Sequence, residues 1–192
     1  VKKGGPLTTL QDLGRYGYQK FGVLVSGAMD DVSLRLSNLL VQNDPGEGAL
    51  EMTMSGPVLV LPAGLVFALT GADMKATLGG KPVPRYRPIY VRKEAILTFG
   101  FAQTGSRAYL SVAGGFDVPQ VMESKSTYLR AKIGGVKGRP IDKGDELPIG
   151  TIGPHQAAFV GRMERSAKEG DSFVTVPWSI DGSFVFAKGP IR

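Results

Sequence analysis

Short apolar runs separated by turn residues fill the middle of this sequence, and they limit the folds open to it more than any other feature. Turn signals such as Gly79-Gly80 and Thr104-Gly105 divide the runs, and glycine (27) and proline (13) are both abundant. Strands at this spacing predict an all-β barrel or sandwich. The runs are Val58 to Leu61, Leu65 to Leu69, Ile89 to Val91, Ile96 to Phe101 and Ala108 to Val112.

One helix and one alternating strand are expected before these runs. Apolar residues recur at helical spacing from Met29 to Val41, and Asp30 or Asp31 stands where it can cap the helix start. From Leu50 to Met54 apolar and polar side chains alternate, which is the period of a strand. Glu51 is therefore expected on the polar face of that strand.

The two ends of the chain have less regular patterns. Lys3 to Tyr18 is rich in Gly, Thr and Gln and predicts a short strand entering a glycine-rich loop. Thr151 to Lys168 is polar and weakly patterned, so we expect a linker or a mobile segment there. A final pair of strands is predicted at Ser172 to Val176 and Ser183 to Ala187.

Composition indicates an ordinary folded domain. Hydrophobic residues make up 42% and charged residues 21% of the 192 residues, far from the balance of disordered chains. There is no cysteine, and no signal-peptide pattern or membrane-length apolar run, so a cytoplasmic protein with no membrane contact is expected. The net charge of +6 is scattered without an interleaved aromatic stripe, which disfavours nucleic-acid binding and suits an acidic partner or anionic substrate.

The first candidate motif is Gln11 to Gly17, in which glycines allow a tight turn and present Asp12 close to Arg15. A carboxylate beside a guanidinium can orient an amide or hold an anion through paired hydrogen bonds. The alternative is that Asp12 and Arg15 only pin the loop to the barrel. Both interpretations stay open on the sequence.

The second motif, Ser26-Gly27-Ala28-Met29-Asp30, opens the predicted helix. Free main-chain amides and the positive end of the helix dipole favour an anion at such a position. Ordinary capping of the helix explains the same residues.

The third motif combines Ser124, Ser126 and Thr127 with Lys125, ahead of a turn at Gly134-Gly135. Hydroxyl donors and an ammonium group can cradle an anionic oxygen, although a solvated polar loop has the same composition.

Two further residues bear on possible chemistry. Glu51 is either a general base or a structural ion-pair partner of Arg15 or Arg35. His155 is the only histidine, so neither a catalytic triad nor a histidine metal site is expected, and we predict no metal. No GK[ST] phosphate loop is present, which disfavours Walker-type ATP binding by this chain.

Together, in this order and spacing, the motifs resemble the allophanate-hydrolase subunit 2 family over residues 1 to about 150, most nearly its bacillary members, the C subunits of 5-oxoprolinase. The matching residues are Gly5 to Arg15, Gly22-Val23, Ser26 to Asp30, Leu50 to Thr53, Gly56-Pro57, Ser106 to Leu110, Val112 to Gly115, Ser124 to Tyr128, Gly134-Gly135, Gly138-Arg139 and Gly144-Asp145.

The resemblance implies a cyclophilin-like β-barrel at residues 1–150, with residues 151–192 leading to a second half that this chain lacks. It implies one component of an ATP-dependent 5-oxoprolinase, which together with the A component and the KipI-like B component cleaves 5-oxo-L-proline, a small anionic amide, to L-glutamate. ATP would act in the complex without necessarily touching this chain. The chain alone is expected to be inactive if the cleft lies between the halves.

The same resemblance implies roles for individual residues. Asp12, Arg15, Glu51 and Lys125 are the expected catalytic residues. The expected substrate-binding residues are Gln11, Ser26, Gly27, Asp30, Ser124, Ser126, Thr127, Gly134 and Gly135. Two other functions stay open: a regulator that neutralises an inhibitor of a sporulation histidine kinase (a KipI antagonist), and a urea-type carboxyltransferase that receives biotin from another chain.

Overall fold

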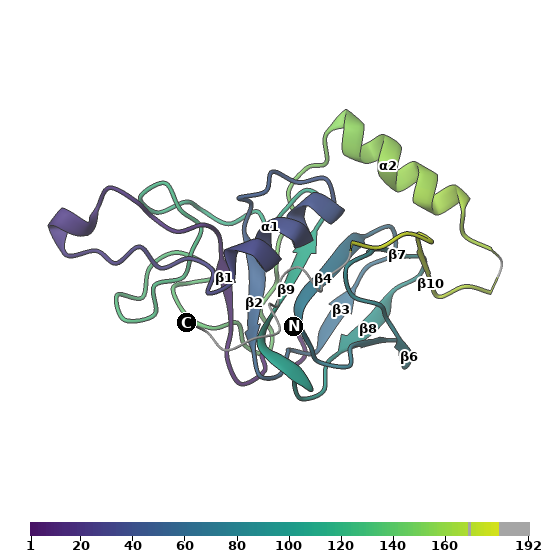
Figure 1. Cartoon of the computed structure of the whole chain (residues 1–192), viewed down its shortest axis with the longest axis horizontal. Coiled ribbons are helices and arrows are strands. Elements are labelled where there is room, and N and C mark those ends of the chain that lie inside the picture. Colours follow the sequence, from purple (N-terminus) through teal and green to yellow (C-terminus); the bar gives the residue numbers. More distant parts are fainter. Residues whose placement is uncertain (169, 181–192) are drawn as a thin grey trace, which may run out of the picture.

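Two antiparallel sheets enclose an apolar core in the computed structural model, which describes residues 1–168 and 170–180 (Figure 1). The larger sheet has the order β1-β2-β9-β4-β7-β10, and the smaller has the order β3-β8-β5-β6. The strands are β1 (Thr8–Gln11), β2 (Ala49–Thr53), β3 (Leu59–Leu61), β4 (Val66–Asp73), β5 (Thr77–Leu78), β6 (Lys81–Pro82), β7 (Pro88–Val91), β8 (Ala95–Thr98), β9 (Thr104–Val112) and β10 (Phe173–Thr175). The predicted all-β, barrel-like class is confirmed.

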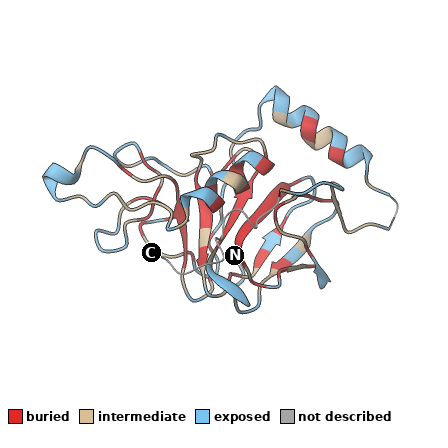
Figure 2. Ribbon diagram, viewed as in Figure 1, coloured by how far each residue is buried: buried red, intermediate tan, exposed pale blue. Residues whose placement is uncertain are grey.

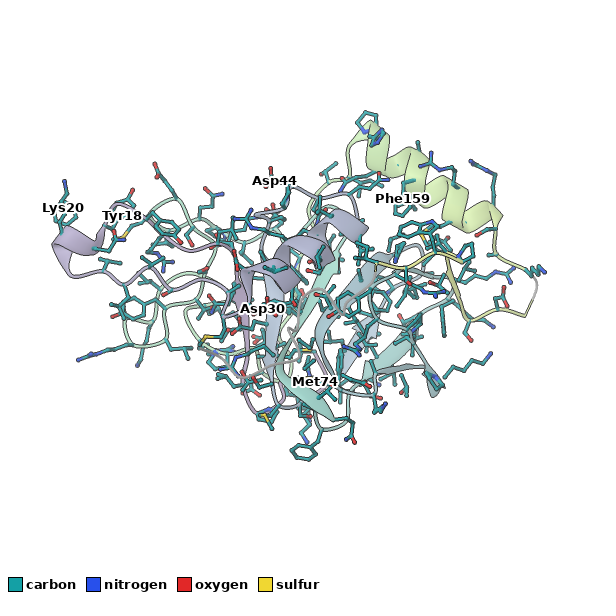
Figure 3. All side chains as sticks on the ribbon, viewed as in Figure 1. Tyr18, Lys20, Asp30, Asp44, Met74 and Phe159 are labelled. Carbon is teal, nitrogen blue, oxygen red and sulfur yellow. The ribbon has the colours of Figure 1, made fainter. Side chains whose placement is uncertain are left out.

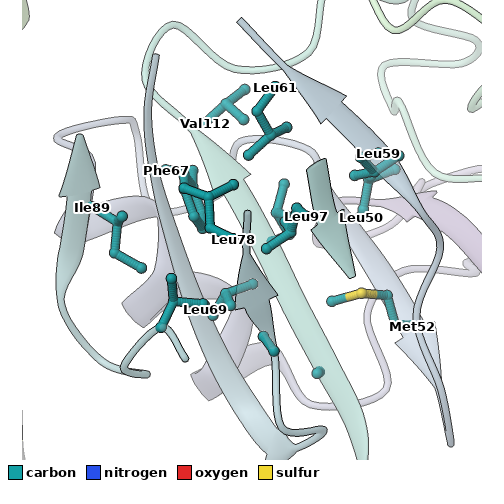
Figure 4. Close-up of a cluster of buried hydrophobic side chains, with 14 of the residues drawn as sticks. Leu50, Met52, Leu59, Leu61, Phe67, Leu69, Leu78, Ile89, Leu97 and Val112 are labelled. Atoms are coloured by element: carbon teal, nitrogen blue, oxygen red, sulfur yellow. The ribbon is translucent and has the colours of Figure 1, made fainter. Parts of the chain in front are cut away.

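The core lies between the sheets, and β4 shows how the sequence builds it. Phe67 and Leu69 point into the barrel, where they join Leu50 from the same sheet and Leu97 from the smaller sheet (Figure 4). The intervening residue Ala68 belongs to a second apolar cluster on the opposite face of the sheet. Strand side chains alternate between faces, so β4 is buried on both sides (Figure 2).

Helix α1 (Asp31–Leu40) covers the outer face of the large sheet and contacts β2, β4 and β9. Of the two predicted caps Asp30 is the one used, because its carboxylate accepts a hydrogen bond from the Ser33 main-chain N at 2.9 Å. Leu34 is fully buried against Ala49 and Tyr109 of the sheet. The chain before α1 extends outward as an arm that carries the short 3₁₀ helix η1 (Gln19–Phe21), with Tyr18 and Lys20 at its tip (Figure 3).

Most of the segment from Thr151 to Lys168, where we expected a linker or a mobile segment, forms helix α2 (Pro154–Arg165). Its apolar side is narrow. Only Phe159 and Met163 are buried, and they pack on the second apolar cluster beneath the helix. A stripe this thin among polar residues gives little periodicity to recognise. Neither α-helix of the described residues is long and apolar enough to span a bilayer.

Three local predictions also need correction or fall outside the structure. The alternation expected through Met54 ends at Thr53, because Met54 has a φ of +62° and is exposed. Thr104-Gly105 is no turn, since β9 begins there and pairs with β4 across a register shift. Of the final strand pair, β10 confirms the first, whereas Ser183 to Ala187 lie outside the described residues.

Candidate functional site

Asp12 follows β1 and joins the first predicted motif to the third. Its Oδ1 accepts hydrogen bonds from the main-chain N of Gly14 at 2.7 Å, from Ser124 Oγ at 2.8 Å and from the Ser126 hydroxyl. Its Oδ2 accepts from the main-chain N of Lys125 at 2.6 Å. The residue is only 9% exposed, so this carboxylate orders the loop around it.

Arg15 is fully buried and does not form an ion pair with Asp12 within the described residues. Its Nε donates to the carbonyl of Val121 at 3.2 Å, and its Nη2 donates to the carbonyl of Ser126 at 2.6 Å. Nη1 is buried and has no hydrogen-bond partner in the described part of the chain. Arg15 thus clamps the 121–126 loop through main-chain oxygens and keeps one unused donor.

Gln11 and Thr127 extend this junction along β1. Gln11 Nε2 donates to the carbonyl of Thr127 at 3.2 Å, and its buried Oε1 has no described partner. The main-chain N and the hydroxyl of Thr127 both donate to the carbonyl of Leu10 at 2.9 Å. The third motif therefore lies alongside the edge strand of the large sheet.

Gly134 and Gly135 lie behind the same loop with φ angles of +68° and +53°. A Cβ at Gly134 would stand 2.1 Å from the Ser126 carbonyl oxygen, and one at Gly135 would stand 1.9 Å from Thr127 Oγ1. Both the conformation and the close approach require glycine. These glycines let the chain pack against the hydroxyl loop.

The Lys125 side chain is directed away from Asp12. Its Nζ lies 2.5 Å from Glu47 Oε1 and donates to the carbonyl of Phe116 at 2.9 Å. Glu47 also accepts a hydrogen bond from the main-chain N of Gly48. Glu47 has no special motif around it in the sequence, so only the folded chain identifies it as the partner of Lys125.

The second motif is attached to the first by main-chain contacts. Ala28 N donates to the carbonyl of Asp12 at 2.9 Å. Ser26 and Gly27 have φ angles of +58° and +90°, and a Cβ at Gly27 would stand 2.9 Å from the main chain of Leu13. This turn delivers Asp30 to the start of α1 (Figure 3).

Glu51 meets the beginning of this helix. Its Oε2 accepts hydrogen bonds from Tyr109 Oη at 2.7 Å and from the main-chain N of Met29 at 2.8 Å. Tyr109 Oη in turn accepts from the main-chain N of Asp30 at 2.8 Å. Burial, reinforced by the adjacent Glu51 carboxylate, raises the pKa of Tyr109 well above its ordinary range, so the phenol remains a donor.

Arg107 is the ion-pair partner of Glu51, in place of the two arginines suggested by the sequence. Its Nε lies 3.5 Å from Glu51 Oε1 without forming a hydrogen bond, and this buried nitrogen has no described acceptor. Arg35 instead lies 3.7 Å from Asp31 on the helix surface. The antiparallel register sets Glu51 opposite Tyr109, so a correct pairing of β2 with β9 is the signal that would have found both residues.

The three motifs therefore form one continuous wall, from the hydroxyl loop through Asp12 to the start of α1 and Glu51. The cavities described in this structure are lined by other residues. Among the buried side-chain atoms of the described residues that have no hydrogen-bond partner, the donors are Thr8 Oγ1, Arg15 Nη1 and Arg107 Nε. Glu51 and Arg107 form a part of this wall that is partly exposed, and a carboxylate beside a guanidinium is chemically suited to an amide or an anion.

Comparison with known proteins identifies sequence relatives of the chain. Residues 21–181 match the family model described as carboxyltransferase domain, subdomain A and B. The C subunit of the Escherichia coli 5-oxoprolinase is 43% identical over 150 residues, which cover 78% of this chain and 48% of that protein. The urea amidolyase of Saccharomyces cerevisiae is 41% identical over 144 residues, covering 74% of this chain and 8% of that protein.

A solved structure shows the same fold. The crystal structure of the Kluyveromyces lactis urea amidolyase superposes with a TM-score of 0.76 at 39% identity, over 81% of this chain and 9% of that one. The chain thus spans about half the length of the bacterial relative and a small part of the fungal ones.

Proposed function

Because this chain belongs to the carboxyltransferase domain, subdomain A and B, family, we propose that it is the C component of an ATP-dependent 5-oxoprolinase. With the A and B components of that enzyme it would open 5-oxo-L-proline to L-glutamate. The observation that carries the proposal is the 43% identity to the E. coli relative over 150 residues. Since the chain spans 48% of that relative, the proposed activity belongs to the assembled complex.

The geometry around Glu51 suits the chemistry of this substrate. 5-Oxo-L-proline carries one carboxylate and one lactam, so its binding site needs a cation and a group that can accept the lactam N–H. Arg107 offers the cation through its partly exposed side chain, and Glu51 offers the carboxylate, whose Oε1 lies 3.5 Å from Arg107 Nε. Tyr109 and the Met29 amide hold one oxygen of Glu51, which leaves the other directed toward Arg107.

The remaining predicted residues would support this pair. Asp12 and Arg15 hold the hydroxyl loop and the turn before α1, and Asp30 caps the helix whose first amides contact Glu51 and Tyr109. We propose that Asp12 and Lys125 act by positioning these segments, because their side-chain atoms are bonded to the protein itself.

We infer that the candidate wall does not bind ATP. A triphosphate needs several cationic donors converging on one place, and the candidate wall offers only Arg107 at its partly exposed end. Lys125 is paired with Glu47, and Arg15 is fully buried. We therefore propose that ATP binds another component of the complex, and we assign no step of its chemistry to residues of this chain.

Reconstitution tests the proposal. Mixing this protein in its full-length form with the A and B components, 5-oxo-L-proline and ATP should produce L-glutamate, measured by an amino-acid assay. Glu51→Gln should lower turnover by about 10²–10⁴-fold while leaving assembly intact, because the amide cannot act as a base. Assembly is followed by size-exclusion chromatography.

Glu94→Gln is the matched control, because Glu94 is exposed on another part of the chain. It should keep full turnover. If the mixture makes no more glutamate than the A component alone, the enzyme proposal is rejected. Equal activity of the two variants would reject Glu51 as the reacting group while leaving the assignment to 5-oxoprolinase intact.

A second candidate is carboxyl transfer from carboxybiotin to urea or a related amide, with biotin supplied by another chain. Two urea amidolyase relatives favour it. The S. cerevisiae protein is 41% identical in sequence, and the solved K. lactis structure superposes with a TM-score of 0.76. Transfer of labelled carboxyl from carboxybiotin to urea, without glutamate formation, would select this function over the first.

A further inference from the structure

A cavity of about 360 Å³ opens at the end of the barrel, where β4 passes the β5–β6 hairpin. Its interior is apolar, with Met74 and Val83 buried and Phe99 beside them. Three charged side chains, Asp73, Lys75 and Arg85, stand on its lining. An apolar cavity of this size with a few convergent polar groups has the features of a small-molecule site.

The charges on this lining are not balanced. Lys75 and Asp73 neutralise each other, since Lys75 Nζ lies 2.7 Å from Asp73 Oδ2 and its main-chain N donates to Oδ1 at 3.0 Å. The hydrogen bond from Lys75 and the nearby Arg85 charge hold the pKa of Asp73 below its ordinary value. Among the described residues Arg85 has no carboxylate partner of its own. The cavity therefore carries one uncompensated positive charge.

Arg85 is held in place before any ligand arrives. Its Nη1 donates to the carbonyl of Gly71, and its guanidinium lies 5.4 Å from the Tyr86 ring centre. The main-chain N of Tyr86 donates to the carbonyl of Leu69 at 2.7 Å, and Tyr86 Oη accepts from Gly71 N at 3.1 Å. These contacts attach the segment to β4, so the cation needs little reorganisation to bind an anion.

Gly71 makes this attachment possible. It has a φ of +80°, and a Cβ there would stand 2.4 Å from the carbonyl oxygen of Arg107. The pairing of β4 with β9 changes register between Gly71 and Asp73. Such irregularities redirect nearby side chains, and this one lies directly beside the charged part of the cavity.

We propose that this cavity binds a small organic monoanion with an apolar body, whose carboxylate pairs with Arg85 while the body packs against Met74, Val83 and Phe99. The site is separate from the 5-oxoprolinase proposal, because none of its lining residues belongs to the predicted catalytic or substrate-binding sets. The two proposals can therefore fail independently.

Three probes with the same phenyl ring but a different charge test the site: benzoate, benzyl alcohol and benzylamine. Each probe is titrated into the full chain up to about 10 mM, because ligands of this small size bind in the millimolar range. Binding is followed by two-dimensional amide NMR. Benzoate should bind tightest and benzylamine weakest, with the largest shifts at Met74, Lys75, Arg85 and Phe99. Equal affinity for the three probes, shifts confined to other residues, or no saturable shift with benzoate would each overturn the proposal.

Substitutions distinguish the effect of the Arg85 charge on binding from the effect of the protein's overall surface charge. Arg85→Gln should weaken benzoate binding about tenfold and leave benzyl alcohol unchanged, because only the charged hydrogen bond is lost. Arg130→Gln, at an exposed arginine outside the cavity, is the matched control and should bind as the parent does. If Arg85→Gln does not fold, Val83→Phe, which fills the cavity from the apolar side, should abolish benzoate binding; retained binding would reject the site.

Discussion

Asp12 holds the hydroxyl loop to the end of β1 by accepting three hydrogen bonds from it, and it accepts a fourth from the main-chain N of Gly14. We expect Asp12→Ala to lower the free energy of unfolding by about 3–5 kcal/mol, because it leaves two buried hydroxyls and main-chain donors without an acceptor. Urea denaturation measures the change. Asp117→Ala, at an exposed aspartate, should stay within about 0.5 kcal/mol. Equal losses for the two variants would contradict the positioning role of Asp12.

Asp145 predicts an acid dependence of stability. Arg139 donates to both of its oxygens at 2.7 Å, and these hydrogen bonds hold the pKa of Asp145 below its ordinary value. Protons therefore bind the unfolded chain first as the pH falls. The contribution of Asp145 to the free energy of unfolding is fully present above the unfolded pKa of about 3.9. It is lost as the pH falls below that value toward the folded pKa.

The urea concentration at half-unfolding, measured at several pH values between about pH 6 and pH 3, reports this effect, because this pH range covers the unfolded pKa of about 3.9. The parent should lose stability more steeply than Asp145→Asn, which cannot titrate at this position. Parallel pH profiles would show that Asp145 does not contribute. Asp117→Asn serves as the control, because its exposed carboxylate should leave the parent's slope unchanged.

Among the structural elements, the loop from Ser124 to Gly135 depends on close main-chain packing. Gly134→Ala should destabilise the chain by about 2–4 kcal/mol, because a Cβ there combines an unfavourable positive φ with a clash at the Ser126 carbonyl. Gly144→Ala separates the two causes, since Gly144 has a φ of +87° but nothing within 4 Å of the added atom. It should cost only about 1 kcal/mol. Thermal or urea unfolding compares the variants, and equal costs would show that the packing is loose.

In the molecule as a whole, α2 forms an outer layer that touches the body through β7 and β10 (Figure 1). Phe159 is one of its two buried anchors, with Met163, and is directed from the helix toward the sheet (Figure 3). We expect Phe159→Ala to speed hydrogen exchange of α2 amides by at least about tenfold, while exchange in β4 and β9 changes less, because thinly attached layers open as separate units. His155→Ala, at an exposed position of the same helix, should leave both unchanged. Equal acceleration throughout would mean that α2 unfolds only with the barrel.

Most strands were predictable because their apolar runs are short and separated by turn residues, whereas the two-residue strands β5 and β6 contain no such run and were not predicted. Helix α1 was predictable because its apolar spacing and its Asp30 cap agree. Helix α2 escaped detection because only Phe159 and Met163 mark its buried side. Within the candidate site, alternation correctly put Glu51 on the polar face of its strand. Its partners Arg107 and Tyr109 come from a strand more than fifty positions away and depend on pairing register.

Local conformation follows from the order of the residues alone: period-two alternation sets which side chains of a strand share a face, and glycine permits the positive φ angles of the turns. The sequence also identifies the family, because residues 21–181 match the family model. Which charges meet depends instead on the folded chain. Asp12 turned inward to hydroxyls and amides, Lys125 turned to Glu47, and Arg85 was left without a described carboxylate. Such pairings depend on long-range packing and on the cost of burying an unpaired group, which no local pattern records.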